Sequence, residues 1–424
     1  MKKVFMRLLP FLIFCYFISF LDRVNVGFAA LQMNKDLGLT ASAFGLGSGL
    51  FFLTYFACEV PSNLLLVRFG ARRWIARIML TWGLVSGATA FVTGPTSFYV
   101  VRLLLGIAEA GCFPGIAFFL TLWFPSSYRA RVMGYLLVAA PMSTVIGGPI
   151  SGALLGMDGH LGMHGWQWLF ILEAIPAVIL AIVTLKYLDD NPTHAKWLSE
   201  DERNWLTRRI TTERSDHRHD LSENVSGVFR NLQVWLLALV AFCFFITIYG
   251  IGFFLPQIIK AFGLTNLETG FVTAIPYIVG SVSMVFWARR SDATRERRFH
   301  IVIPTCIAGC ALIAAALTQD PLLKMLAFCV AAFGIFGALP AFWAINTNLL
   351  SGRAAAAGIA LIGAVGNLGG FVGPFAIGLS KDITGSYASG LLLFAVVAFF
   401  AAGVSYLAGK PAVRDTVVDP STQG

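Results

Sequence analysis

Long runs of apolar residues, separated by short polar segments, extend along almost the whole chain. Each run is long enough for a helix that crosses the hydrocarbon core of a bilayer, which takes ~20 residues. The runs predict an all-α membrane protein with twelve transmembrane helices. These cover residues 10–31, 42–67, 75–93, 97–123, 131–156, 167–187, 231–256, 268–288, 300–318, 322–345, 354–378 and 387–408.

One long polar stretch, residues 188–230, interrupts this pattern between the sixth and seventh runs. It predicts an N-terminal six-helix bundle (1–187), a cytoplasmic linker (188–230), a C-terminal six-helix bundle (231–410) and a cytoplasmic tail (411–424). Within the linker, Ser199 and Glu202 have the spacing of a helix capping box. We therefore expect part of the linker to be helical.

The two halves resemble each other at a fixed offset of 225 or 226 residues. The basic turn 68–73 returns at 295–298, Pro114 returns as Pro340, and Gly148-Pro149 returns as Gly373-Pro374. Three landmarks in the same order indicate a duplication. Two pseudo-symmetric bundles of this kind place a substrate site between them, near the bilayer midplane.

The charge distribution indicates membrane topology rather than nucleic-acid binding. The chain is 57% hydrophobic and 12% charged, with a formal net charge of +9. Of its 31 Lys and Arg residues, 25 fall in segments on one side of the predicted membrane, four fall on the other side, and two lie within helices. The positive-inside rule therefore predicts a multi-pass protein of a bacterial inner membrane with both termini in the cytoplasm. All seven cysteines lie in apolar spans, at spacings that suit neither disulfides nor a metal site.

Four charged residues fall in the middle of predicted spans. They are Asp22 and Arg23 in the first span and Arg102 and Glu109 in the fourth. A charge at the bilayer centre costs roughly 2.5–3.5 kcal/mol on insertion scales, so each is a candidate functional residue. The repeat places Thr247, Ile248, Phe328 and Ile335 at the equivalent positions. A structural ion-pair network is the alternative interpretation, but the fold does not require charges at these positions in the second half.

The chain resembles the major facilitator superfamily and, within it, the anion:cation symporter family. The resemblance covers nearly the whole chain and rests on residues 20–25 (FLDRVN), 59–63 (EVPSN), 68–73 (RFGARR) and 166–170 (WQWLF), and on Arg102 with Glu109. It implies that Asp22 and Glu109 are the proton-coupling acids and that Arg102 couples them to the substrate. It also implies that Arg23 contacts the carboxylate of the substrate.

Uncharged residues complete the predicted substrate site. Tyr55 matches a tyrosine of the family, and Asn367 would supply a hydrogen bond from the second half. Tyr249, Gln257, Trp343 and Asn346 are further polar or aromatic positions for which packing is the alternative. Two more acids, Glu59 and Glu173, are placed toward the cytoplasmic ends of their helices and interpreted as structural.

The basic turns between spans predict a cytoplasmic gate. Its members are Arg68, Arg72 and Arg73 after the second span and Asp292 after the eighth. The first turn departs from the superfamily signature, because Asn63 and Val67 replace its glycine and aspartate. We therefore expect the gate to depend on Asp292 and on the arginines.

Together these features predict proton-coupled uptake of a small organic anion by a secondary transporter. The candidate substrates are a tartrate-like dicarboxylate, a sugar acid and an aromatic carboxylate. No Walker A, HExxH or GxSxG motif occurs in the sequence, so we expect neither enzymatic activity nor a cofactor. We expect a proton gradient to supply the energy for transport. We expect a monomer in the lipid bilayer, with no nucleic-acid partner. The alternative is an efflux antiporter for amphipathic compounds, because residues 144–152 partly resemble an antiporter signature.

Overall fold

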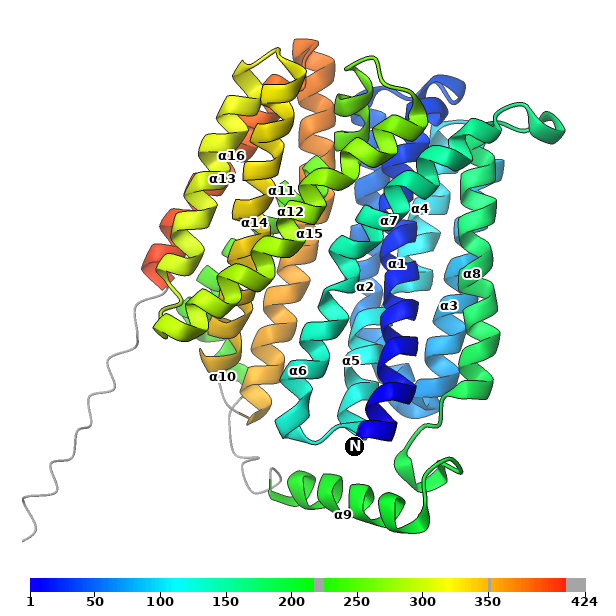
Figure 1. Cartoon of the computed structure of the whole chain (residues 1–424), viewed down its shortest axis with the longest axis vertical. Coiled ribbons are helices and arrows are strands. Elements are labelled where there is room, and N and C mark those ends of the chain that lie inside the picture. The colour runs from blue at the N-terminus through cyan, green and yellow to red at the C-terminus, as the bar shows by residue number, and fades with distance from the viewer. Residues whose placement is uncertain (217–224, 350–351, 409–424) are drawn as a thin grey trace, which may run out of the picture.

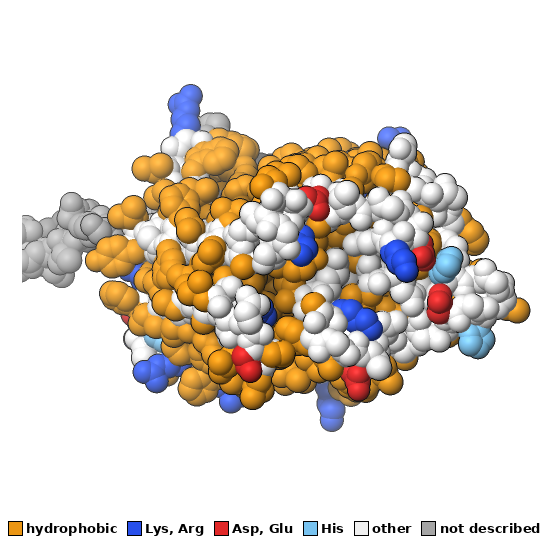
Figure 2. All heavy atoms as spheres, turned by 90° about the horizontal axis from the view of Figure 1, so that it is seen from above, with side chains coloured by type: hydrophobic (Ala, Val, Ile, Leu, Met, Phe, Trp, Pro, Cys, Tyr) orange, Lys and Arg blue, Asp and Glu red, His pale blue; other side chains and the backbone are white. Residues whose placement is uncertain are grey.

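The computed structural model describes residues 1–216, 225–349 and 352–408. The predicted tail 411–424 and residues 409–410 lie outside this part. The described residues contain twelve helical spans that are long and apolar enough to cross a membrane, as the apolar runs predict. The apolar side chains cover the flanks of the molecule, as Figure 2 shows from one end.

Six spans form each half of the chain. The first six are α1 (Lys2–Asp36), α2 (Ala41–Phe69), α3 (Ala71–Ala88), α4 (Pro95–Glu109) continued by α5 (Cys112–Trp123), α6 (Ser126–Leu137) continued by α7 (Ala139–Leu154), and α8 (Gly165–Tyr187). The last six are α11 (Leu232–Lys260), α12 (Asn266–Thr294), α13 (Phe299–Leu317), α14 (Pro321–Leu349), α15 (Gly352–Thr384) and α16 (Ala388–Ala408). The two bundles lie side by side (Figure 1). Between them the linker carries α9 (Glu200–Asp216) and α10 (Val225–Arg230).

Helix α9 lies across one end of the N-terminal bundle, close to the N-terminus (Figure 1). The predicted capping box starts it, since Ser199 and Glu202 exchange hydrogen bonds of 3.0 and 3.2 Å. Lys3 Nζ lies 2.7 Å from Glu202, and its hydrogen bond lowers the pKa of that carboxyl. Glu213 accepts from the backbone N–H of Ser126 at 2.9 Å. The linker helix is therefore fastened to the first bundle. We call this the α9 end and the opposite one the far end.

The two bundles touch along the far halves of their helices. Helix α2 packs on α15, and α7 packs on α12. A Cβ at Gly148 would lie 2.8 Å from the carbonyl oxygen of Gly270, and a Cβ at Gly270 would lie 2.4 Å from that of Gly148. At the extreme far end, Asp382 accepts hydrogen bonds from the backbone N–H groups of Ala41 and Ser42, at 3.1 and 2.8 Å. The glycines thus let the two backbones meet and close the far end.

Replacing Gly270 by Leu should open this seam, because real Cβ atoms do not approach a carbonyl oxygen to 2.4 Å. Spin labels at His160 and Leu267, on the two sides of the seam, should show a longer distance distribution in Gly270→Leu than in the parent. The same change at Gly403 on α16, where a Cβ would meet nothing within 4 Å, is the control. An unchanged distance in Gly270→Leu would mean that the seam tolerates the side chain.

The fourth span is broken where the sequence pattern predicts one helix over 97–123. Helix α4 ends at Glu109, Gly111 has a φ of 86°, and α5 starts at Cys112. The equivalent span of the second half, α14, runs unbroken through Gly337. Only Gly adopts such a φ without strain, so the glycine permits the break but does not cause it. The periodicity cannot reveal such a break, because the apolar run continues through it.

Candidate functional site

The four charged residues predicted from the sequence meet inside the N-terminal bundle. Asp22 and Arg23 lie on α1, and Arg102 and Glu109 lie on α4. Each side chain is at least nine-tenths buried. All four mid-span charges therefore lie in the interior of one bundle.

Arg23 and Glu109 form the ion pair of the cluster. Nε and Nη2 of Arg23 each lie 2.8 Å from Oε1 of Glu109, and Ser19 Oγ donates to the same oxygen at 2.8 Å. The other oxygen, Oε2, has none of these bonds. Glu109 is thus the counter-ion of the arginine that was predicted to bind the substrate.

Asp22 binds neutral donors rather than an arginine. Its Oδ1 accepts from Ser86 Oγ at 2.5 Å and from Asn25 Nδ2 at 2.9 Å, and its Oδ2 accepts from Trp82 Nε1. Asp22 therefore makes no ion pair with Arg23 or Arg102 in the part of the chain that the structure describes. The helical spacing of Trp82 and Ser86 on α3 could have suggested a polar pair, but not its partner.

Arg102 is the least satisfied of the four. Its Nη2 donates to the carbonyl oxygen of Ser48 at 3.4 Å, its Cζ lies 5.3 Å from the ring centre of Phe51, and its Nε has no hydrogen-bond partner among the described residues. A buried guanidinium with an unpaired donor is costly. The coupling role of Arg102 stays a prediction.

The break between α4 and α5 fixes the end of α4 that carries Glu109. Ser62, from the EVPSN motif of α2, donates to the carbonyl oxygen of Ala110 at 2.6 Å and accepts from Trp74 Nε1 at 3.0 Å. A Cβ at Gly111 would lie 2.5 Å from Ser62 Oγ. The serine of the motif thus satisfies the carbonyl that the break frees, and so holds the backbone beside Glu109.

Aromatic rings enclose the guanidinium of Arg23. Its Cζ lies 5.0 Å from the ring centres of Phe20 and Tyr55 and 5.3 Å from that of Phe51. Tyr249, from the C-terminal bundle, lies beside the same guanidinium. The structure therefore brings Tyr55, and also Tyr249, to Arg23. Cation–π contact holds an arginine in position without neutralising it.

Asn367 lies farther along the boundary between the bundles, beside Glu59 of α2. Both side chains are only partly buried. Gln257, in contrast, contacts Asn34 at 3.3 Å near the far end, which favours packing for that residue. Asn367 thus faces an acid across the bundles, and its substrate role stays a prediction.

The predicted gate residues do not meet across the bundles in this conformation. Asp292 pairs with Arg297 of its own bundle at 2.6 Å. The backbone N–H of Arg72 binds Asp190 at 2.8 Å, and Arg68 stacks on Phe69. The structure shows no ion pair from Arg68, Arg72 or Arg73 to the part of the C-terminal bundle that it describes. The predicted gate across the bundles therefore stays a prediction.

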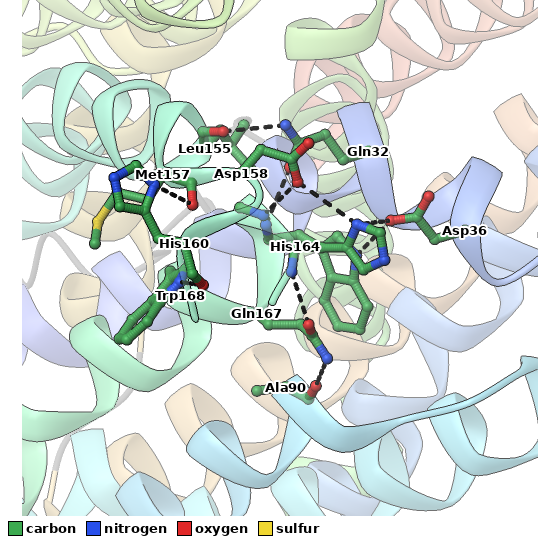
Figure 3. A network of polar contacts seen from close by, with 12 residues as sticks. Gln32, Asp36, Ala90, Leu155, Met157, Asp158, His160, His164, Gln167 and Trp168 are labelled. Carbon is green, nitrogen blue, oxygen red and sulfur yellow. Dashed lines mark hydrogen bonds and ion pairs between the residues drawn. The ribbon is translucent and has the colours of Figure 1, made fainter. Parts of the chain in front are cut away.

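The WQWLF motif belongs to a polar network at the far end (Figure 3). Trp166 Nε1 donates to Asp36 at 2.8 Å, Gln167 Nε2 donates to the carbonyl oxygen of Ala90 at 2.8 Å, and Trp168 Nε1 donates to that of His160 at 3.1 Å. These bonds tie α8 to α1, to the turn Thr89–Phe91 that follows α3, and to the loop before α8. The motif therefore holds α8 to its neighbours at the far end and lies apart from the charged cluster.

The second half has an apolar cavity where the first half has its charges. The equivalent residues Thr247, Ile248, Phe328 and Ile335 all line this cavity, whose volume is about 30 Å³. The structure thus supports the alignment of the two halves. The charge asymmetry between them is a property of the site and not of the fold.

Two six-helix bundles joined by one linker, with a buried charged cluster in one of them, define a secondary transporter of the membrane. The chain belongs to the Major Facilitator Superfamily, whose family model matches residues 12–374. A relative from Agrobacterium vitis named "Putative tartrate transporter" is 50% identical over 97% of this chain and 95% of its own length.

Other relatives carry different names. "Quinolone resistance transporter" of Acinetobacter baumannii is 42% identical, over 96% of this chain and 94% of its own. "Putative metabolite transport protein NicT" of Pseudomonas putida is 43% identical, over 93% and 91%. Among solved structures, an inward-facing bacterial homologue of the human lysosomal transporter Spinster superposes with a TM-score of 0.80 at 19% identity, covering 96% of this chain and 98% of that one. This last likeness shows the fold alone.

Proposed function

We propose that this transporter takes up a small organic anion together with protons. The observation that carries the proposal is the buried pair of Arg23 and Glu109, in which a titratable acid occupies the guanidinium that would bind a carboxylate. Two relatives that share half of the residues are named for tartrate, which supports an anionic substrate.

The proposed coupling follows from the geometry of this pair. A proton that binds Glu109 turns the carboxylate into a neutral acid and weakens its hold on Arg23. Nε and Nη2 of Arg23 then point to a carboxylate of the substrate, which replaces the lost negative charge. The coupling is reciprocal, because a substrate that binds first draws Arg23 away from Glu109 and so favours the binding of a proton to that carboxylate. Proton and anion therefore favour each other's binding.

A second candidate function is efflux of amphipathic compounds in exchange for protons. It is supported by the relative named for quinolone resistance, at 42% identity. It is disfavoured by the two buried arginines, which would repel an organic cation. The two functions differ in the direction in which a proton gradient drives the substrate.

The test uses purified protein and proteoliposomes. A thermal-shift screen of tartrate, sugar acids and aromatic carboxylates should first identify a stabilising anion. Proteoliposomes with an imposed inward proton gradient should then accumulate that anion. Movement of the anion in the direction opposite to the imposed proton gradient would favour the efflux function instead. Stabilisation of the protein by amphipathic cations alone would do the same.

We also propose that the α9 end faces the cytoplasm. The basic turns 68–73 and 295–298 and the N-terminus all belong to this end, which agrees with the positive-inside rule. A reporter fused after Gly424 should be active only in the cytoplasm. Periplasmic activity of that fusion would contradict the proposed orientation.

A further inference from the structure

The contact that closes the extreme far end joins a carboxylate of one bundle to a helix start of the other. Asp382 lies in the last turn of α15, and α2 starts at Ala41. Oδ1 of Asp382 accepts the backbone N–H of Ala41 at 3.1 Å, and Oδ2 accepts that of Ser42 at 2.8 Å. One carboxylate thus binds two successive N–H groups of a helix that belongs to the other half of the chain.

Helix α2 is capped from both bundles. The first N–H groups of any helix have no partner within the helix. Thr40, the residue before α2, accepts the N–H of Ala43 at 3.1 Å with its own hydroxyl group. The N–H groups of Ala41 and Ser42 precede that one and go to Asp382. Since Thr40 already supplies a cap from within its own bundle, the additional bonds from Asp382 act between the bundles.

The hydrogen bonds of Asp382 are charge-assisted. The N-terminus of a helix carries a partial positive charge, so a carboxylate is favourable there. In the part of the chain that the structure describes, the carboxylate takes all its hydrogen bonds from residues 40–42 of the other bundle. The neighbouring cation, Lys381, is turned to its own loop and donates to the carbonyl oxygen of Gly385 at 2.5 Å. The charge of Asp382 is therefore directed across the seam.

Glycines bring Asp382 within reach of α2. Gly378 lies one turn before Asp382 on the same face of α15, and a Cβ there would lie 2.2 Å from the carbonyl oxygen of Ala41. A Cβ at Gly45, one turn into α2, would lie 2.2 Å from the carbonyl oxygen of Pro374. The two helices thus meet backbone to backbone, and Asp382 lies at the outer end of their contact.

The contact of Asp382 is both charged and reversible. Its side chain is exposed, so water can solvate the carboxylate and the two N–H groups when they separate. A carboxylate buried in the seam would lose its partners at a much higher cost. A second polar contact between the bundles at this end, from Asn34 Nδ2 to Gln257 Oε1, is neutral and 3.3 Å long. Asp382 therefore adds a charged contact that the bundles can still break.

We propose that Asp382 is a latch of the far end, whose bonds to α2 favour the closed state and break each time that end opens. Transporters built from two such bundles expose their site to the two sides of the membrane in turn, as one bundle rocks against the other. The rocking must separate Asp382 from Ala41 and Ser42 in one part of the cycle. The latch thus sets the ratio of closed to open molecules. The inference needs only this rocking and does not depend on the proposed anion or on proton coupling.

Distances between spin labels test the latch. The labels are attached at Lys35 and Gln319, exposed residues of the two bundles at the far end, in a background without the native cysteines. The parent protein in lipid nanodiscs should show mainly the distance of the closed state. Asp382→Ala should raise the ratio of open to closed molecules about fivefold, which is the typical effect of losing a helix cap. Asp382→Asn should have a smaller effect, because its amide oxygen can still accept one N–H.

Asp320 provides a matched control at the same end of the molecule. Its Oδ1 accepts the N–H of Leu323 at 2.8 Å, so it also caps a helix, but that helix, α14, belongs to its own bundle. Asp320→Ala should therefore leave the distance distribution unchanged. An unchanged distribution in Asp382→Ala, or an equal shift in Asp320→Ala, would refute the latch.

Amide hydrogen exchange tests the contact itself without spin labels. Asp382→Asn should exchange faster than the wild type in the peptide that contains residues 41–42, although the substitution lies in the other bundle. Asp320→Asn should not change this peptide. Unchanged exchange in Asp382→Asn would show that the carboxylate does not hold these N–H groups. If Asp382→Ala does not fold, the spin-label distances of Asp382→Asn decide, and a distribution equal to that of the parent would contradict the proposal.

Discussion

Arg23→Lys is expected to weaken the binding of tartrate, or of the anion that best stabilises the protein, by about ten- to a hundredfold, although it keeps the positive charge. Arg23 reaches Glu109 Oε1 with two nitrogens, Nε and Nη2, both at 2.8 Å, which shows that the fork points to one carboxylate position. A lysine ammonium is a compact point charge and cannot present that fork. Losing one charge-assisted hydrogen bond costs about 1.5–3 kcal/mol, which corresponds to this range.

The measurement is a binding isotherm of the purified variant beside its thermal unfolding curve. Arg208→Lys, the same change at an exposed position of α9, is the control and should leave affinity unchanged. The rings of Phe20 and Tyr55, each 5.0 Å from the guanidinium, should keep the lysine stem in place, so the fold should survive. Near wild-type affinity in a folded Arg23→Lys variant would remove Arg23 from the substrate site.

The fold could be predicted from the sequence because the bilayer imposes one strong constraint. A helix that crosses lipid must be apolar where it faces the lipid, so each span shows as a long, mostly apolar run. The same constraint makes Asp22, Arg23, Arg102 and Glu109 conspicuous, since charges are rare in such runs. The duplication could also be recognised from the sequence, because Pro114 and Pro340 stand at equivalent positions in apolar segments of the two halves.

The polar partners of the site could not be predicted in the same way. Ser86, Trp82 and Asn25 around Asp22 are residue types that also occur as ordinary interhelical contacts, and nothing in their spacing on α1 and α3 says which acid they face. Glu173 was expected toward the cytoplasmic end of its helix, but it lies in the first half of α8, which begins with Gly165 at the far end. Its depth depends on where α8 begins. The loop after α7 decides that, and the apolar pattern does not reveal it.

The conformation is a further property that the sequence alone leaves open. Gly148 and Gly270 indicate that two helices can approach closely, but the same glycines serve any state in which the far end is closed. The predicted gate residues Arg68 and Asp292 are an example of contacts that the sequence suggests but this conformation does not show. The structure shows no ion pair between them in the part of the chain that it describes, since Asp292 instead pairs with Arg297, and the gate stays a prediction.

Glu109→Gln is expected to abolish accumulation of the anion against its gradient while leaving exchange across the membrane intact. Gln resembles the protonated acid permanently, so Arg23 loses its charged partner and remains available to a substrate carboxylate. Ser19 Oγ and the arginine can still donate to the amide oxygen, which should preserve the local structure. The assay is proteoliposome uptake of labelled tartrate with and without an inward proton gradient, run beside counterflow. Asp201→Asn on α9 should behave as the wild type in both.

Asp22→Asn should also lose concentrative uptake, but for a different structural reason. Asp22 accepts three hydrogen bonds from Ser86, Trp82 and Asn25, and an asparagine puts an N–H₂ group against donors that need an acceptor. We therefore expect a lower unfolding temperature in Asp22→Asn and not in Glu109→Gln, and counterflow that is reduced together with uptake. Comparison of the two variants separates a coupling acid from an acid that also holds the bundle together. If both variants still accumulated the anion at the wild-type level, the cluster would be a structural ion-pair network and the coupling would have to lie elsewhere in the molecule.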